Sequence, residues 1–224
     1  MNFQETLFPG YTIGEDAYQN IPAVCAPFGK KAAIIGGKHA LAAAEEKIRR
    51  AVEGSDIEIT GTYWYGGEAS VENIAMLEPQ VKEADMLFAV GGGKAIDTVK
   101  VLAHMTHRPF FTFPTIASTC ASCTSLGILY HPDGSLREYS FSKIPPNHIF
   151  IDPQIIADAP VKYLWAGMGD TMAKHFECTT SSRGDVPSTP TTWASLSAPC
   201  APSPSSAGAR RPWRTARPTR SPMS

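Results

Sequence analysis

The stretch Met86-Leu87-Phe88-Ala89-Val90-Gly91-Gly92-Gly93-Lys94-Ala95-Ile96-Asp97-Thr98-Val99-Lys100 leads from five apolar residues through three glycines into a helix-forming segment. This order predicts a phosphate cradle, because glycine lets backbone N–H groups approach an anion and a helix N-terminus adds the positive end of its dipole. Lys94 supplies a mobile cation, and Asp97 and Lys100 follow about one and two turns further along. We therefore expect Gly91, Gly92, Gly93 and Lys94 to hold a nucleotide pyrophosphate.

Two common nucleotide signatures do not fit this spacing. A Walker A loop requires glycine where Phe88 stands and Ser or Thr where Ala95 stands. The G-x-G-x-x-G fingerprint, begun at Gly91, would require glycine at Ile96. Taken alone, the triplet is equally compatible with an ordinary strand-to-helix turn.

The surrounding chain alternates short apolar runs with helical patterns, which predicts β-α-β units and a parallel sheet. An Asp-Gly turn at residues 133–134 indicates a pair of antiparallel strands on either side of it. The expected fold class is α/β: a parallel-sheet dinucleotide-binding domain over residues 1–160, then the truncated start of an all-helical domain over residues 161–185. Strands are expected at 32–35, 57–60, 86–90, 110–113, 126–130, 136–141 and 147–151, and helices at 40–52, 71–81, 95–104, 153–159 and 161–178.

Composition limits the class of protein. The 224 residues are 43% hydrophobic, which is sufficient for a core. Residues 1–185 carry a net charge of −6, so no clustered basic surface indicates nucleic acid as a partner. The N-terminus has no export signal and no apolar run reaches membrane-spanning length, so we expect a cytoplasmic protein without a membrane partner. Five cysteines without an export signal argue against a disulfide framework.

Residues 186–224 differ from everything before them. They contain eight Pro, eight Ser and five Arg, and no Lys, Asp, Glu, Ile, Phe, Tyr or His. Such a segment cannot bury a core, and we expect it to be a disordered tail. Our hypothesis is that it is an out-of-frame translation of the gene; a natural disordered tail is the alternative.

Three motifs in order resemble the iron-containing alcohol dehydrogenase family, most closely its glycerol dehydrogenase-like branch. They are the glycine segment at residues 91–100, Pro114-Thr115-Ile116-Ala117-Ser118-Thr119, and Gly167-Met168-Gly169-Asp170-Thr171-Met172-Ala173. The segment Tyr65-Gly66-Gly67-Glu68-Ala69-Ser70 also fits that branch. The resemblance extends from near the N-terminus to Asp185 and implies an NAD(P)-linked, metal-dependent oxidoreductase.

By this resemblance, the cofactor is NAD or NADP and the pyrophosphate is held by the glycine triplet and Lys94. Further cofactor contacts are implied for Asp97, Thr115, Ser118, Thr124, Leu126 and Tyr130. The first strand ends in Gly36-Gly37-Lys38-His39, where NAD-specific members have an acidic residue that binds the ribose. A cation in place of a carboxylate favours a 2′-phosphate, so NADP is at least as well supported as NAD.

The same resemblance implies a divalent metal, iron or zinc, with Asp170 as one ligand. A catalytic metal needs about three protein ligands. Position 174 is Lys where iron-type members have His, and no histidine follows His175, so we expect an incomplete metal site. No catalytic residue is assigned.

The substrate is expected to be a small alcohol, polyol or carbonyl compound. Cys120 stands where glycerol dehydrogenases have a substrate-binding aspartate, which weakens the case for glycerol itself. We interpret the Cys120-Ala121-Ser122-Cys123 spacing as small residues that line a pocket. The alternatives are a nucleotide-binding module without catalysis and a dehydroquinate synthase-like lyase. Little or no activity and self-association are expected of this chain, with a homo-oligomer as one possible form.

Overall fold

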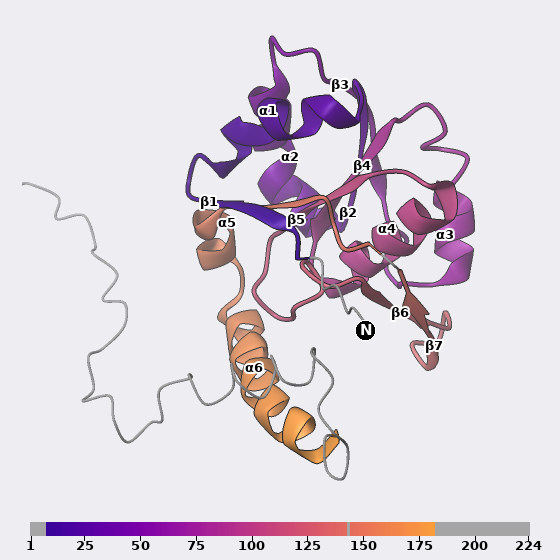
Figure 1. Ribbon diagram of the computed structural model, residues 1–224, viewed down its shortest axis with the longest axis vertical. Helices are drawn as coiled ribbons and strands as arrows, with labels where there is room; N and C mark the ends of the chain where they lie inside the picture. Colours follow the sequence, from indigo (N-terminus) through magenta and orange to yellow (C-terminus); the bar gives the residue numbers. More distant parts are fainter. Residues whose placement is uncertain (1–7, 143, 182–224) are drawn as a thin grey trace, which may run out of the picture. The chain divides into compact units, whose positions relative to one another are not determined.

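A six-stranded parallel sheet forms the centre of the computed structural model, which describes residues 8–142 and 144–181 (Figure 1). The strand order is β1-β8-β5-β4-β2-β3, and every pairing in this sheet is parallel. The strands are β1 (Gly10–Ile13), β2 (Lys31–Gly36), β3 (Glu58–Trp64), β4 (Met86–Gly91), β5 (Phe110–Pro114) and β8 (His148–Ile151). The α/β class and the parallel sheet are thus confirmed, while the predicted tail at 186–224 lies outside the described residues.

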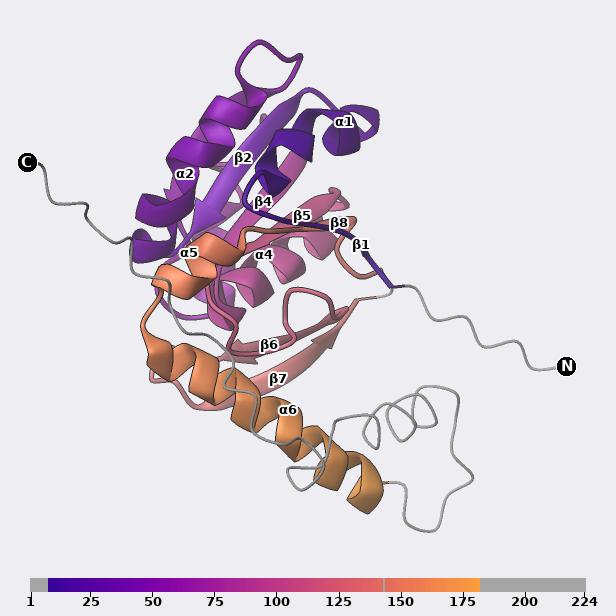
Figure 2. The ribbon, with the colours of Figure 1, turned by 90° about the vertical axis from the view of Figure 1, so that its left-hand side faces the viewer.

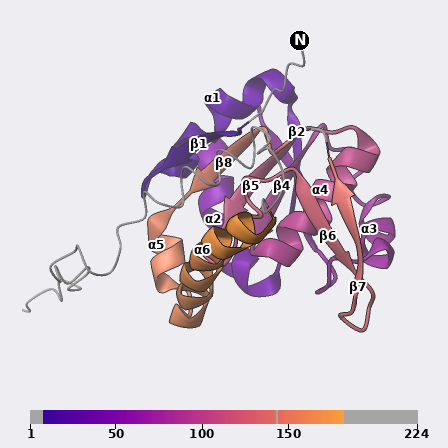
Figure 3. The same cartoon turned by 60° about the horizontal axis from the view of Figure 1, so that its bottom comes forward.

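A separate antiparallel hairpin follows β5, as the Asp-Gly turn predicted. It consists of β6 (Leu126–Tyr130) and β7 (Leu136–Phe141), and Leu126 pairs with Phe141 at its open end. The hairpin lies beside α4 (Gly93–Thr106), which contacts β6 (Figure 3). The side of the sheet that carries α4 is therefore covered by helix and hairpin together.

The remaining helices are η1 (Ala17–Asn20), α1 (Ile21–Cys25), η2 (Ala26–Phe28), α2 (Lys38–Val52), α3 (Val71–Leu77), α5 (Pro153–Asp158) and α6 (Val161–Ser181). Two of them, α3 and α5, begin at a residue whose side chain caps the helix. Ser70 caps α3 by accepting a hydrogen bond from the Asn73 amide at 3.3 Å. Asp152 caps α5 through the Gln154 amide at 2.9 Å, and Pro153 occupies the first helical position.

The sequence did not predict β1 or the helical turns at residues 17–28. β1 has only four residues and lies at the edge of the sheet, with Tyr11 and Ile13 exposed. It therefore lacks the buried apolar run by which the inner strands were recognised. The strand expected at 57–60 also continues through Gly61 to Trp64, because it pairs with β2 along its whole length.

Alternate residues of the inner strands point into two different cores. In β4, Phe88 and Val90 pack on the side of α1 and α2, whereas Leu87 and Ala89 pack on the side of α3 and α4. The layers of helix, sheet and helix are visible when the molecule is turned (Figure 2). A strand buried on both faces needs apolar residues at every position, which explains the continuous run before Gly91.

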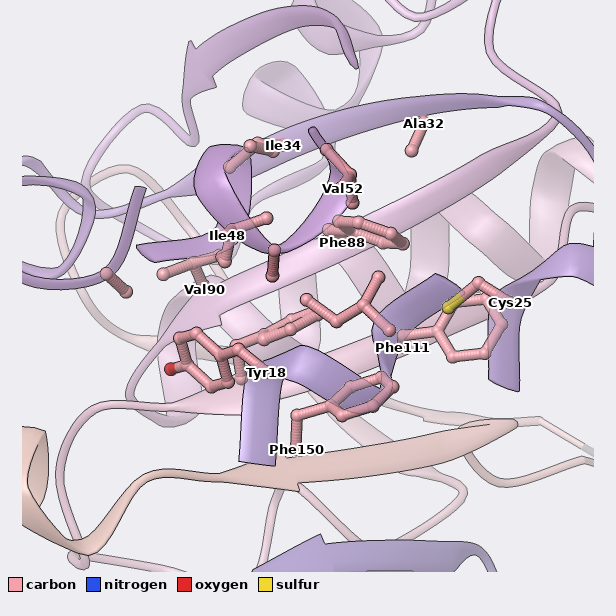
Figure 4. Packing of buried hydrophobic residues seen from close by; sticks show 14 of the residues in the cluster. Tyr18, Cys25, Ala32, Ile34, Ile48, Val52, Phe88, Val90, Phe111 and Phe150 are labelled. Atoms are coloured by element: carbon pink, nitrogen blue, oxygen red, sulfur yellow. The ribbon is translucent and has the colours of Figure 1, made fainter. Parts of the chain in front are cut away.

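Aromatic rings fill the core beside α1 and α2 (Figure 4). Phe113 stacks on Phe150 with ring centroids 5.0 Å apart and meets the edge of Tyr18 at 5.3 Å. Phe88 lies edge-to-face with Phe111 at 5.8 Å. Each such pair adds about 0.5–1.5 kcal/mol beyond the area that it buries. The carboxyl ends of β4 and β5 are consequently fixed by packing directly behind the glycine triplet.

Helix α6 carries an exposed apolar stripe. Trp165, Met168, Met172 and Phe176 are 67%, 58%, 66% and 68% exposed. The chain divides into two compact units, Met1–Met172 and Ala173–Ser224, so the division falls inside α6. No helix in the described ranges 8–142 and 144–181 is long and apolar enough to cross a membrane.

Candidate nucleotide-binding site

The strand order places a topological switch point between the carboxyl ends of β2 and β4. From β2 the chain enters α2 and returns as β3 on one side, whereas from β4 it enters α4 and returns as β5 on the other side. Because α2 and α4 pack on opposite faces, the two connections move apart above these neighbouring strands. Ligands of open α/β sheets bind at such a switch point. The glycine-rich turns at residues 36–37 and 91–93 follow these two strands and lie there.

The glycine triplet adopts a backbone that other residues would not tolerate. Gly91 has φ +145°, and a Cβ at this position would lie 3.1 Å from the Cβ of Ala95. A Cβ on Gly92 would lie 2.5 Å from Cδ1 of Ile116. The loop after β5 is held against the turn by the Thr115 amide, which donates to the Gly91 carbonyl at 3.2 Å. The absence of side chains at 91–92 therefore allows the two loops to close together.

Helix α4 presents its N-terminus at this turn. Its N-cap is Gly92, which makes no side-chain capping hydrogen bond, and the helix runs for 14 residues. The first amides of a helix have no acceptor within the helix, and the helix dipole adds positive potential at the same point. This end of α4 suits an anion such as a pyrophosphate.

Lys94 is tied to two other segments. Its Nζ donates to Oε2 of Glu68 at 2.6 Å and lies 5.6 Å from the ring centroid of Tyr130. The hydrogen bond that Lys94 donates to Glu68 is the main reason that the pKa of Lys94 is raised above its ordinary value, so the side chain stays a cation. The amide of Tyr130 in turn donates to the Ala69 carbonyl at 2.7 Å. The segment 65–70, the helix start and β6 thus meet around one ammonium group.

Asp97 and Lys100 form a buried ion pair one turn into α4. Lys100 is fully buried, and its Nζ donates to Oδ1 of Asp97 at 3.0 Å. The same Nζ donates to the carbonyls of Ala121 at 3.0 Å and Leu126 at 2.7 Å and to Oγ1 of Thr124 at 3.3 Å. The ammonium therefore anchors the segment between β5 and β6 on the helix that begins at the glycine triplet.

Asp97 is held by contacts within the protein, and its contact with a cofactor stays a prediction. Its second oxygen, Oδ2, accepts the Ile128 amide at 3.3 Å, and only 7% of the residue is exposed. Burial raises the pKa of Asp97, and the adjacent Lys100 ammonium opposes that shift. These partners support a role in anchoring the hairpin. The sequence signal for it was an Asp and a Lys three positions apart on a helix that is otherwise largely apolar.

The second glycine turn lies at the end of β2. Gly37 is the N-cap of α2 and also has no side-chain cap. The Gly36 carbonyl accepts the Tyr65 amide at 3.2 Å, and the ammonium of Lys38 lies 4.7 Å from the ring centroid of Trp64. The predicted cation Lys38 is therefore placed at the carboxyl edge of the sheet, at the start of a helix.

Hydrogen bonds bring some of the expected cofactor residues together, whereas Ser118 and Cys120 lie on the more exposed part of the loop. Thr115 is buried against Gly91, while Thr124 and Leu126 share the Lys100 ammonium. Ser118 is half-buried, and Cys120 is exposed in the following turn. A Cβ on Gly167 of α6 would collide with the Ala117 carbonyl, so the helix backbone passes close to this loop.

Asp170 follows Gly167 by three residues, which is about one helical turn. In the described part of the chain, no group of three or more His, Cys, Asp or Glu side chains could hold a metal ion. The described residues therefore do not supply the set of about three ligands that a catalytic metal requires. Asp170 remains a single candidate ligand.

A shallow hollow lies at the opposite edge of the sheet. It is formed by the end of α2 and the start of β3, with Arg49, Arg50 and Glu46 among its lining residues. It contains no glycine-rich turn at a helix N-terminus and none of the predicted site residues.

A doubly wound parallel sheet, two glycine turns at its switch point and an uncapped helix N-terminus define the class of nucleotide-binding α/β domains. Residues 9–153 match the family model described as iron-containing alcohol dehydrogenase. The chain belongs to the iron-containing alcohol dehydrogenase family, as the three motifs predicted.

Similar proteins agree with this assignment. The chain is 34% identical over 180 residues to a glycerol dehydrogenase of Thermotoga maritima, a match that covers 77% of this chain and 47% of that protein. It is 33% identical over 180 residues to a glycerol dehydrogenase of Escherichia coli O6:H1, covering 78% and 48% of the two chains. The solved glycerol dehydrogenase of Schizosaccharomyces pombe superposes with a TM-score of 0.75 at 29% identity, covering 88% of this chain and 52% of that one. The chain spans about half the length of these relatives.

Proposed function

We propose that this chain is the nucleotide-binding half of an NAD(P)-linked oxidoreductase that acts on a small alcohol, polyol or carbonyl compound. The observation that carries the proposal is the glycine turn at residues 91–93, which opens α4 at the switch point of the sheet. Membership of the family and the similarity to glycerol dehydrogenases support it. When bound, the nicotinamide supplies the chemistry by accepting or donating hydride.

Different residues of the chain have different roles in binding the cofactor. The amides at the start of α4 and the Lys94 ammonium hold the pyrophosphate, and the short side chains of Thr115 and Ser118 border it. Lys100 does not touch the cofactor in this scheme; it positions Thr124 and Leu126 on the nicotinamide side. The Lys94–Glu68 ion pair keeps the ammonium close to the helix N-terminus before a phosphate competes for it.

NADP is proposed as the better cofactor on local charge. The end of β2 offers Lys38 on the side where the adenosine ribose is expected, and the strand runs into Gly36 and Gly37 where a ribose-binding carboxylate would be needed. Each cofactor should be titrated separately by the quenching of tryptophan fluorescence. A clear preference for NAD would contradict this part of the proposal.

A nucleotide-binding protein without turnover is the second candidate. It is favoured by the described residues, which supply Asp170 but no three-ligand group. Assay of NAD(P)-linked alcohol oxidation with added iron or zinc separates the two candidates. Turnover that requires metal supports the oxidoreductase, whereas binding of the dinucleotide without turnover supports the second candidate.

Lys94→Met tests the site itself, with Lys30→Met as the matched control. Lys94 lies at the glycine turn, whereas Lys30 lies at the other edge of the sheet in a salt bridge with Asp56 whose side chains are 76% and 86% exposed. Loss of one hydrogen bond to a charged group costs about 1.5–3 kcal/mol, so Lys94→Met should weaken dinucleotide binding by roughly ten- to a hundredfold. Equal affinities for the two variants would refute the site.

A further inference from the structure

Residues 120–123 form a tight turn beside the glycine triplet, with a cysteine at each end. The Cys123 amide donates to the Cys120 carbonyl at 3.0 Å, which is the hydrogen bond of a β-turn. The Cα atoms at the ends of such a turn are less than about 7 Å apart. A disulfide requires Cα atoms roughly 4.4–6.8 Å apart, so the turn brings the two backbones to bridging distance.

The two side chains are placed to complete that bridge. Cys123 is half-buried, and its Sγ donates to the Cys120 carbonyl oxygen at 3.2 Å, so this sulfur already lies over the other cysteine. Cys120 is exposed, so its thiol is open to a small oxidant from solvent. Burial is the main cause that raises the pKa of Cys123, and the neighbouring Cys120 raises it further. Cys120 is therefore the accessible thiol and Cys123 the sheltered partner.

The backbone between the cysteines is held by hydrogen bonds from α4 and β5. The Ala121 carbonyl accepts the Lys100 ammonium at 3.0 Å, and the Ser122 carbonyl accepts Oγ1 of Thr112 at 2.9 Å. Because both internal residues of the turn are fixed on α4 and β5, the ends of the turn are kept near each other. An unconstrained chain would have to lose conformational freedom to form the same bridge.

We propose that Cys120 and Cys123 are a reversible oxidation site, at which a peroxide converts the two thiols into one disulfide and thereby regulates nucleotide binding. The Cys120 thiolate attacks hydrogen peroxide, takes one oxygen to become a sulfenic acid and releases hydroxide, which takes up the proton that the thiol lost. The Cys123 sulfur then attacks the sulfenic sulfur, and the second oxygen leaves as water. Two thiols and one peroxide thus give one disulfide and two waters, and a dithiol such as dithiothreitol reverses the change.

The regulatory part rests on the proposed function, because it concerns the same glycine turn. A Cβ on Gly93 would lie 3.2 Å from Oγ1 of Thr119 and 3.8 Å from the Cβ of Ala121, so the cysteine turn borders the start of α4. A disulfide fixes both ends of this turn and limits how far Ala121, whose carbonyl is held by Lys100, can adjust to a bound phosphate. The disulfide form should therefore bind the dinucleotide more weakly than the dithiol form.

The disulfide itself is tested by mass, without reference to activity. The 224-residue protein is reduced, treated with hydrogen peroxide, alkylated and digested, and the cross-link is located in the peptides. We expect a loss of two hydrogens in the peptide that contains residues 120–123, reversed by dithiothreitol and absent from Cys120→Ser and Cys123→Ser. A cross-link to any other cysteine, or sulfinic acid at Cys120 without a cross-link, would overturn the site.

The regulation is tested by titrating NAD and NADP against the reduced and the oxidised protein. Weaker binding after oxidation, recovery with dithiothreitol and no response to peroxide in Cys123→Ser are the expected results. Equal affinities of the reduced and disulfide forms would overturn the regulation. If the reduced protein binds neither dinucleotide, the proposed function fails and the regulation falls with it, whereas the mass result still decides the oxidation site.

Discussion

Replacing Lys100 by methionine tests the anchor that joins the glycine helix to the hairpin. The substitution keeps an unbranched side chain of similar length but removes an ammonium that is fully buried and has four acceptors at 2.7–3.3 Å. It also leaves the carboxylate of Asp97, a residue that is only 7% exposed, with the Ile128 amide as its remaining described donor. Breaking a buried pair in this way costs about 3–5 kcal/mol of unfolding free energy. At roughly 2–4 °C per kcal/mol for a chain of this size, Tm should fall by roughly 6–20 °C.

The assay is urea unfolding of the wild type, Lys100→Met, Asp97→Asn and the double variant. Because each single change leaves a partner uncompensated, the double variant should lose less than the sum of the two, with a coupling energy of about 0.5–3 kcal/mol. Lys30→Met removes the same charge from an exposed pair and should change the free energy by no more than about 0.5 kcal/mol. If Lys100→Met lowers the free energy of unfolding by less than about 1 kcal/mol, or if the two single effects simply add, the Lys100–Asp97 pair is not a coupled anchor.

Three further predictions concern the backbone, acid stability and association. Gly91→Ala forces a side chain into φ +145°, which costs about 1–3 kcal/mol, and an unchanged thermal midpoint would contradict it. Asp85 accepts the amides of residues 30 and 31 at 2.8 and 2.9 Å, and these bonds hold its pKa below the usual range. The stabilisation from this depressed pKa is present above the ordinary pKa of about 4 and disappears as pH falls through the folded value. Asp85→Asn should therefore lessen the loss of stability on acidification, and superimposable acid-unfolding curves would count against this. Replacing Trp165, Met168 and Met172 together by glutamine removes an exposed apolar stripe and should lower self-association in sedimentation velocity. An unchanged distribution of species would exclude the stripe as its cause.

The inner fold could be predicted from the sequence because its strands are buried on both faces. The runs before Gly36, Gly91 and Pro114 contain apolar residues at successive positions, and helices with a different periodicity separate them. The edge strand β1 carries no such pattern, since exposed Tyr11 and Ile13 alternate with polar or small neighbours. Its position became clear only from its pairing with β8, in which Gly10 pairs with His148, 138 residues further along the chain.

The candidate site likewise has features that the local sequence predicts and others that only the fold brings together. The glycine triplet and Lys94 could be identified from local sequence, because a turn followed by a helix N-terminus is a local structure. The partners of Lys94 and Lys100 could not, since Glu68 and the carbonyls of Ala121 and Leu126 come from distant segments. The same holds for Asp97: spacing along α4 shows which turn of the helix it occupies, but only the structure shows that its carboxylate accepts the Ile128 amide of the hairpin.

We place the bound dinucleotide at the carboxyl ends of β2 and β4. Hydrogen–deuterium exchange of the reduced protein, measured with and without saturating NADP and NAD, tests this placement most directly because it reports the position of binding rather than its consequence. We expect slower exchange in peptides that contain residues 91–95 and 36–38, with little change at residues 46–59 around the shallow hollow. Protection centred on residues 46–59, or no protection at the glycine turns under conditions where binding is measured, would contradict it.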